Sequence, residues 1–304
     1  MKFTTSIPLI VLMIGLAKPS YAMDSDNNTL KSTSVDYILK NRAKFKDQIA
    51  LLPEGIKEII QSKQIKLDQQ LLDATSTGNI NKVKEALSQG ADSNAEDKNK
   101  GNSTPLLLAA GYDDSDIVKL LLENNALIDK QNKFGITPLA SAAHNNSLKS
   151  VALLLQNGAQ PNIKDDEGCT ALQHAIRFDA RYDIIKNLLD HQAEYNTITS
   201  ESSDCPQPID LAIINKNTQV LETLLALPDI KININHLREL ARRITNSKTR
   251  RAIEMLINKK ALEFQRAGLA ALGALSGTVA SNNPPLPKEI VGVIADYAGY
   301  KPRK

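Results

Sequence analysis

Tryptophan is absent from this sequence of 304 residues, and phenylalanine and tyrosine together make up only 4% of it. A buried core must therefore be built from Leu, Ile, Val and Ala, since hydrophobic residues as a whole still reach 42%. Small aliphatic side chains suit helices that pack closely together. This composition is typical of a soluble, folded protein.

A strong excess of charge of one sign is also lacking. Lys and Arg number 37 against 34 Asp and Glu, which gives a net charge of +3. Such a balance does not indicate that the protein binds nucleic acid or an anionic membrane. We therefore expect no nucleic-acid partner.

Motifs that carry catalysis are missing as well. The sequence has no GxGxxG or Walker phosphate loop, no HExxH and no GxSxG. Its four histidines are scattered, and none has metal-ligand spacing to a cysteine or another histidine: His144, His174, His191 and His236. The sequence predicts no catalytic residue, no metal site and no cofactor, so we expect the protein not to be an enzyme. His174 is expected to be a packed or capping residue.

The N-terminal segment has the layout of a secretory signal peptide. Lys2 precedes the apolar run "IPLIVLMIGLA" of 11 residues, and Ser20 and Ala22 place small residues at −3 and −1 of a cleavage site. The run is too short to span a membrane comfortably. We predict that residues 1–22 are removed after Ala22, and that the protein is secreted or periplasmic with no transmembrane span. An uncleaved anchor or a buried helix is the alternative.

A repeated pattern occupies the middle of the chain. Thr104, Thr137 and Thr170 open equivalent segments that are 33 residues apart, and Gln207 opens another 37 residues later. Small residues follow each start and allow helices to approach closely. An apolar second helix comes next in each unit: "IVKLLL", "VALLL", "IIKNLL" and "VLETLL". The pattern predicts pairs of helices that recur along the chain.

This pattern resembles the ankyrin repeat, which has the same period and a Thr-Pro-Leu-His-x-Ala signature. The threonine can cap the first helix, and Pro at the first helical position loses no needed N–H. Gly90 and Gly158 fall where the second helix must end with positive φ. A single helix pair cannot bury its own apolar face, so neighbouring pairs must stack. The resemblance implies an all-α ankyrin-repeat solenoid of about five repeats with helical caps at both ends.

The repeats depart from the family pattern in three ways. The fourth signature position, usually His, is here Leu107, Ala140, Gln173 or Asp210. The fourth repeat carries an extra residue within "RFDARYD". The fifth ends in "LPDIKININ" without its glycine, so we expect looser stacking there.

We predict the following organisation after the signal peptide. Residues 23–67 form a polar segment and an N-terminal helical cap, and residues 68–235 form the repeats: 68–98, 99–131, 132–164, 165–199 and 200–235. Residues 236–265 form a degenerate helical cap, because solenoids need a polar outer end. Residues 266–304 are expected to be a Gly/Ala-rich linker and a short C-terminal helix.

The two cysteines, Cys169 and Cys205, lie in successive turns between repeats. Export would permit a disulfide. However, Cys205 aligns with Gly168 rather than with Cys169, and a bridge needs Cα atoms within about 7 Å. Separate thiols are the default expectation, with a bridge left open.

The degenerate cap is rich in basic residues, with eight Lys and Arg between Arg238 and Lys260. No aromatic residue interrupts them, so there is no stacking platform for a single nucleic-acid strand. We interpret them as a solvated face. The alternative is that they bind an anionic ligand.

Two segments, "LPEGIKEII" at 52–60 and "LPKEIVGVI" at 286–294, share a Leu-Pro-x-x-Ile frame. The frame resembles the opening of an F-box, the adaptor-binding helix set of ubiquitin ligases, and a similar motif ends some ankyrin proteins of poxviruses and intracellular bacteria. Only 19 residues remain from 286 to 304, too few for a whole F-box. The simpler interpretation is Pro at the start of an amphipathic helix.

Ankyrin proteins bind other proteins through the turns between repeats and the exposed side of the first helix. The resemblance therefore implies a partner-binding set of seven residues: Tyr112, Phe134, Ile136, His144, Asn145, Arg177 and Phe178. Aromatic and Arg side chains are frequent hot spots of interfaces. We expect a monomer with an exposed binding stripe.

The sequence thus predicts an exported, non-catalytic scaffold that binds a protein partner. It resembles exported ankyrin proteins of host-associated bacteria, which implies a host protein as the partner. Two alternatives remain open. One is a ubiquitin-ligase adaptor acting through the Leu-Pro-x-x-Ile segments, and the other is a structural protein retained in the cell envelope.

Overall fold

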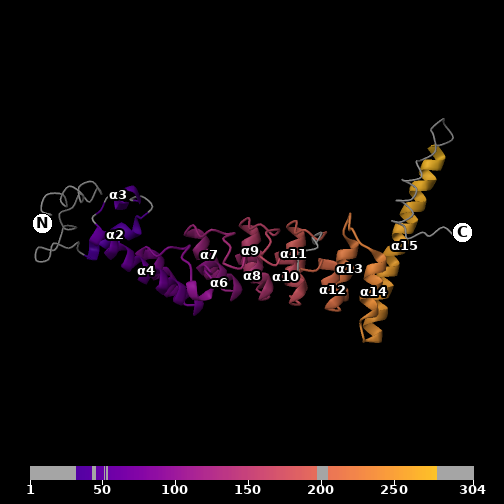
Figure 1. The fold of residues 1–304 in the computed structure, drawn as a ribbon, viewed down its shortest axis with the longest axis horizontal. Helices are drawn as coiled ribbons and strands as arrows, with labels where there is room; N and C mark the ends of the chain where they lie inside the picture. The colour runs from indigo at the N-terminus through magenta and orange to yellow at the C-terminus, as the bar shows by residue number, and fades with distance from the viewer. Residues whose placement is uncertain (1–31, 43–45, 51, 53, 197–204, 279–304) are drawn as a thin grey trace, which may run out of the picture. The chain divides into compact units, whose positions relative to one another are not determined.

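The computed structural model of the chain describes residues 32–42, 46–50, 52, 54–196 and 205–278. The regular structure of these residues is helical, as predicted (Figure 1). The chain divides into two compact units, Met1–Asp166 (unit 1) and Glu167–Lys304 (unit 2). The predicted signal peptide, residues 1–22, and the Leu-Pro-x-x-Ile segment at 286–294 lie outside the described residues.

Unit 1 contains an N-terminal cap and three helix pairs. Its helices are α2 (Ser32–Lys40), α3 (Lys46–Ala50), α4 (Glu54–Ser76), α5 (Ile80–Gln89), the short 3-10 helix η2 (Lys98–Lys100), α6 (Pro105–Gly111), α7 (Ser115–Glu123), α8 (Pro138–His144) and α9 (Leu148–Gln156). The first helices α4, α6 and α8 pack in succession, and so do the second helices α5, α7 and α9. The pairs therefore form two layers of helices.

Unit 2 repeats this arrangement. Its helices are α10 (Ala171–Arg177), α11 (Tyr182–Asp190), α12 (Pro208–Ile214), α13 (Thr218–Ala226), α14 (Ile234–Arg242) and α15 (Ser247–Thr278). Helices α10, α12 and α14 pack in one row, and α11, α13 and α15 pack in the other. The pair α14–α15 thus stacks on the fifth repeat as a sixth helix pair.

Local sequence signals explain where the first helices begin. A threonine with an extended backbone precedes each of α6, α8 and α10: Thr104, Thr137 and Thr170. Its hydroxyl accepts a hydrogen bond from the backbone N–H of the third residue after it, at 3.2, 3.1 and 3.4 Å respectively. In the first two cases proline follows at the first helical position. Gln207 takes the place of threonine before α12 and makes no side-chain cap bond.

The turns within each repeat require a left-handed backbone. Gly90 directly follows α5 and Gly158 lies two residues after the end of α9, with the predicted positive φ of +99° and +86°. At Gly90 the backbone of Leu39 approaches so closely that an added Cβ would lie 2.7 Å from its carbonyl carbon. Gly90 is thus required both for its φ and for the contact with the cap.

The paired alanines lie where first helices meet. Ala109, Ala110, Ala142 and Ala143 are fully buried. Large aliphatic side chains fill the rest of the core: Leu106, Ile117, Leu121, Leu139 and Leu154 in unit 1, and Leu172, Ile176, Ile184, Ile185 and Leu188 in unit 2. Small residues at the contact let the helices approach, and the leucine and isoleucine side chains then close the space between the layers.

The N-terminal cap and the first repeat share one helix. Helix α4 runs without interruption from Glu54 to Ser76, so the predicted boundary between residues 67 and 68 falls inside it. Its N-terminal half joins α2 in one cluster of buried residues: Val35, Ile38, Leu39, Leu52, Ile60 and Leu67. Two residues of the first Leu-Pro-x-x-Ile segment, Leu52 and Ile60, are therefore buried in the core of the cap.

The C-terminal end differs from the prediction. Residues 266–278 were expected to be a linker, but α15 continues through them to Thr278. The prediction was wrong because it gave weight to the glycines, whereas Ala and Leu, the strongest helix formers, make up most of this stretch. Among the described residues, no helix combines the length and the apolar character needed to cross a membrane.

Candidate interaction surface

Tyr112 stands at the C-terminal end of α6, with 57% of its surface exposed. The backbone beside it is tightly held. The hydroxyl of Ser147 donates to the carbonyl of Gly111 at 3.0 Å, and a Cβ on Gly111 would come within 2.9 Å of the Ser141 hydroxyl. An exposed aromatic ring is thus presented from a fixed backbone position.

His144 and Asn145 end the next first helix, α8, and both are exposed. Asn145 is the capping residue of α8, as Tyr112 is of α6. Its amide donates to the carbonyl of Ser141 at 2.9 Å. The two predicted positions are therefore equivalent in successive repeats of unit 1, and both lie on the surface.

Phe134 and Ile136 lie in the turn between the second and third repeats. Phe134 is 52% exposed, whereas Ile136 is half-buried. Backbone hydrogen bonds join neighbouring turns. The N–H of Lys133 donates to the carbonyl of Gly101 at 2.9 Å, and the N–H of Asp166 donates to the carbonyl of Phe134 at 3.1 Å. The sequence correctly indicated turn tips, but not that the tips bond to one another.

One side of the Phe134 ring is used within the fold. A Cβ on Gly101 would lie 2.7 Å from the ring, so the ring rests on that glycine. The Lys133 ammonium lies 4.9 Å from the ring centroid, within the range of a cation–π contact. The sequence pattern did not indicate that Phe134 has this structural role. A partner can therefore reach only the remaining part of the ring.

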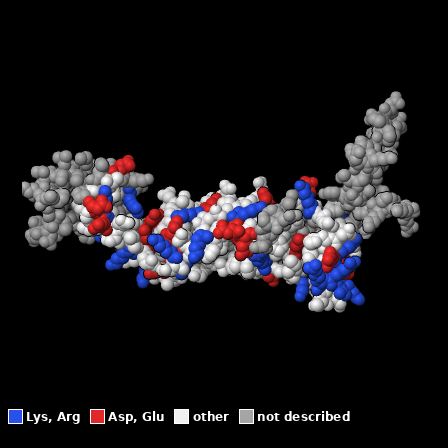
Figure 2. All heavy atoms as spheres, in the orientation of Figure 1, with Lys and Arg blue, Asp and Glu red and all other residues white. Residues whose placement is uncertain are grey.

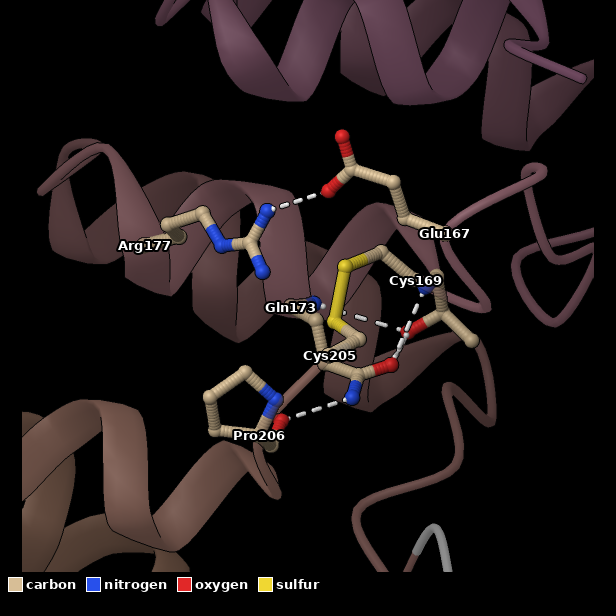
Figure 3. Close-up of a disulfide and its surroundings, with 7 residues drawn as sticks. Glu167, Cys169, Gln173, Arg177, Cys205 and Pro206 are labelled. Carbon is tan, nitrogen blue, oxygen red and sulfur yellow. Dashed lines mark hydrogen bonds and ion pairs between the residues drawn. A yellow bond between two sulfur atoms is a disulfide. The ribbon is translucent and has the colours of Figure 1, made fainter. Parts of the chain in front are cut away.

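In unit 2, Arg177 and Phe178 end α10. The Arg177 guanidinium donates to the carboxylate of Glu167 at 2.8 Å, which orients it (Figure 3). Phe178 is 48% exposed, and its ring stacks on His174 with centroids 6.2 Å apart. His174 is buried, as expected for a packed residue. Unit 2 thus presents a cation and an aromatic ring at adjacent positions.

A disulfide joins Cys169 and Cys205, whose Cα atoms are 5.4 Å apart (Figure 3). The expectation of separate thiols was wrong. The sequence alignment offset the two cysteines by one residue, but the loops that carry them run close enough for that offset to be absorbed. Both cysteines are fully buried.

Gln173 adds hydrogen bonds to this junction. Its side-chain oxygen accepts from the N–H of Thr170 at 3.0 Å, which completes a capping box. Its side-chain nitrogen donates to the carbonyl of Pro206 at 2.8 Å (Figure 3). The loops before α10 and α12 are therefore tied both covalently and by a buried amide.

Among the exposed apolar residues outside the predicted seven, Ile214 and Leu127 lie within the repeats. Ile214 lies beside the capping position of α12 and is 52% exposed. Leu127 follows α7 and is 58% exposed. The repeat spacing does place Ile214 on the same first-helix surface, because it is equivalent to Arg177. For Leu127 the sequence offered no such signal, since it lies in a short apolar run between Ala126 and Ile128.

The basic residues of the C-terminal cap gather over α14 and the start of α15 (Figure 2). Acidic and amide groups of the same helices contact some of them. Arg243 lies 3.7 Å from Glu239, and Arg238 donates to the side-chain oxygen of Asn258 at 2.9 Å. These exposed pairs fit the interpretation of a solvated face.

In both units, helix pairs of one pattern stack on one another, and this defines a helical-repeat protein. The family described as ankyrin repeats (3 copies) matches residues 71–165 and, overlapping them, 125–199. Over residues 71–199 the helix pairs of this chain are thus similar to ankyrin repeats, and their stacking agrees with the fold that the sequence predicted. Proteins with such repeats generally mediate contacts between proteins and generally do so without catalysis.

A known protein of similar sequence is an ankyrin repeat protein of fowlpox virus (strain NVSL). The two chains are 31% identical over 174 residues, which is 57% of this chain and 51% of the viral one. The chain thus spans about half the length of this relative.

Proposed function

We propose that this protein is an exported, non-catalytic scaffold that binds a protein partner through its first-helix ends and its turn tips. The observation that carries the proposal is the exposure of Tyr112, Phe134 and Phe178, at 57%, 52% and 48%. Aromatic residues are only 4% of the chain, yet three of them lie at the positions that ankyrin repeats use for binding. Exposed aromatic residues of this kind are the usual anchors of an interface.

The rigidity of these positions supports the proposal. Side chains that are held before binding lose less conformational entropy when the complex forms. Phe178 is stacked on His174, Arg177 is oriented by Glu167, and Phe134 rests on Gly101. Each unit therefore offers preorganised anchors, and we expect both units to contribute to binding.

The binding proposal is tested with alanine variants in each unit. Tyr112→Ala and Phe178→Ala, separately and together, are used as bait in extracts of the cell envelope and of the host. Met255→Ala is the matched control, since Met255 is 72% exposed but lies on α15, the second helix of its pair. We expect each single variant to weaken capture and the double variant to abolish it, with the control unchanged.

Thermal melts separate binding from folding in this test. Because Tyr112 and Phe178 are about half exposed, their removal should leave the melting curve almost unchanged. Undiminished capture by the double variant would contradict the proposed surface. A protein of the host among the captured partners would support a host-directed role, and the absence of any partner in either extract would count against the scaffold.

Export is supported by the disulfide between Cys169 and Cys205. Disulfides form and persist in oxidising compartments, including the periplasm and the outside of the cell. The predicted signal peptide at residues 1–22 points the same way. Mass spectrometry of the protein from its native cell should find a chain that starts at Met23 with its two cysteines bonded. An intact Met1 in the cytoplasmic fraction would refute export.

The two alternative functions, a ubiquitin-ligase adaptor and a structural protein of the envelope, each require a different observation. An adaptor function requires exposed Leu-Pro-x-x-Ile segments, but Leu52 and Ile60 of the first segment are buried in the N-terminal cap. It would therefore depend on the segment at 286–294. A structural role in the envelope requires retention there, so recovery of the mature chain from the medium would argue against it.

A further inference from the structure

A pocket of about 320 Å³ lies beside the first helix of the fifth repeat, α12, and the start of α14. Ile209, Ile232 and Leu237 form its apolar walls. Three ionisable residues also line it: Asp210, His236 and the exposed Lys231. All these residues belong to unit 2, and none is among the residues of the proposed function.

The pocket reflects a change at one repeat position. In the fourth repeat this position is Gln173, whose side chain spans to the carbonyl of Pro206 at 2.8 Å. In the fifth repeat the same position is Asp210. An aspartate is shorter by one methylene and has no N–H to donate, so it cannot make this contact with the next turn. The pocket lies beside the aspartate that takes the place of this glutamine.

The carboxylate of Asp210 is incompletely satisfied. Its side chain is only 16% exposed. One oxygen lies 3.3 Å from Nε2 of His236, while the other is buried and has no hydrogen-bond partner among the described residues. Burial raises the pKa of Asp210, and the nearby His236 opposes this rise. A buried carboxylate with one long hydrogen bond is costly, so a cation that reached it would gain a strong interaction.

We propose that this pocket binds a guanidinium group on an aliphatic stem, as in an arginine side chain. A planar guanidinium can donate two parallel hydrogen bonds to one carboxylate, which here requires the Asp210 side chain to turn so that its buried oxygen faces the pocket. The walls formed by Ile209, Ile232 and Leu237 then cover the methylene groups of the stem. The volume lies at the lower end of the range for small-ligand pockets, which fits one side chain rather than a larger molecule. Lys231 is exposed, so water and salt screen its charge.

The test is an NMR titration of the full chain with Nα-acetyl-arginine amide, following the ring signals of His236. Nα-acetyl-citrulline amide is the matched probe, because it has nearly the same shape but no charge. We expect a saturable shift of the His236 signals with a millimolar dissociation constant for the arginine probe. Binding of the citrulline probe should be at least tenfold weaker.

Variants assign the binding to Asp210. Asp210→Asn keeps the size of the side chain but removes its charge, and should weaken binding of the arginine probe at least tenfold. Asp183→Asn, at an exposed acid on α11, should leave it unchanged. Ile232→Phe should block the pocket while keeping the carboxylate, which gives an independent check if Asp210→Asn disturbs the fold.

The outcomes test whether the pocket binds a guanidinium group and whether that group comes from a polypeptide or from free arginine. Equal shifts with both probes, unaltered binding in Asp210→Asn or Ile232→Phe, or no saturation with the arginine probe would each overturn it. Free L-arginine is the last probe. If the capped probe binds at least as well, the ligand is an arginine side chain of a polypeptide, and if free arginine binds much more tightly, the pocket serves the amino acid itself.

Discussion

Cys169 and Cys205, separated by 36 residues, are joined by a disulfide that links the loop before α10 to the loop before α12. The bond therefore encloses both helices of the fourth repeat, α10 and α11. Successive repeats of a solenoid otherwise hold together only through their shared interface. At this junction a covalent bond supplements that interface.

Loss of this disulfide should destabilise unit 2. Closing a loop of this length contributes about 3–4 kcal/mol in the chain-entropy description. We expect the Cys169→Ala, Cys205→Ala double variant to unfold at a clearly lower urea concentration than the oxidised parent. Reductant should lower the midpoint of the parent and leave that of the variant unchanged. A parent whose midpoint does not respond to reductant would show that the bond contributes nothing.

Leu154 should be indispensable for the third repeat, because it is fully buried on α9. Leu154→Asp places a charge without a partner among aliphatic side chains, at a cost of roughly 3 kcal/mol or more. The loss should spread to adjacent repeats, since each depends on its neighbours. Lys149→Asp, at an exposed position of the same helix, is the control and should melt like the parent. Coinciding urea melts of Leu154→Asp and the parent would contradict this burial.

Lys216 has a backbone conformation that a lysine adopts only at a cost. Its φ is +61°, and its side chain is exposed. Equivalent turns use residues that tolerate this region better: Gly78, Asp113, Asn146 and Asp179. Lys216→Gly should therefore stabilise unit 2 by about 0.5–1 kcal/mol. Lys216→Ala, which keeps the strain, should bring no gain in a thermal melt, and equal melts of the two variants would refute the explanation.

Asp114 should make stability depend on pH. It stands at the start of α7, where its side chain makes no cap bond. Burial raises its pKa above the ordinary 3.8, with further contributions from Asp113 and Asp116. Because the folded state then takes up a proton more readily than the unfolded state, the charge on Asp114 lowers stability at neutral pH. This loss diminishes as the pH falls through the raised pKa towards 3.8.

Asp114→Asn removes that charge, so it should raise the melting temperature at pH 7 and match the parent near pH 3. Asp183→Asn is the control, because Asp183 is an exposed acid in the first turn of another helix, α11. An acid in the first turn of a helix interacts favourably with the helix dipole, so its removal should give no gain at pH 7. A constant advantage of Asp114→Asn at every pH would show that its charge is not the cause.

Much of the fold could be predicted because its signals are local. Thr104 and Thr137 cap helices that start at the next residue, Gly90 and Gly158 have positive φ just after helices end, and Leu154 is buried as its helical spacing indicates. Each of these features depends on residues within about one helical turn. The period of 33 residues then indicates that the units stack on one another.

The remaining features depend on distances between residues that lie about one repeat or more apart in the sequence. The bond between Cys169 and Cys205, the contact of Phe134 with Gly101 and the pocket beside Asp210 all arise where one repeat meets the next. The repeat period brings equivalent positions together, but it does not set the distance between two loops to within an ångström. That distance is fixed by how the side chains of the two layers pack, which only the tertiary structure decides.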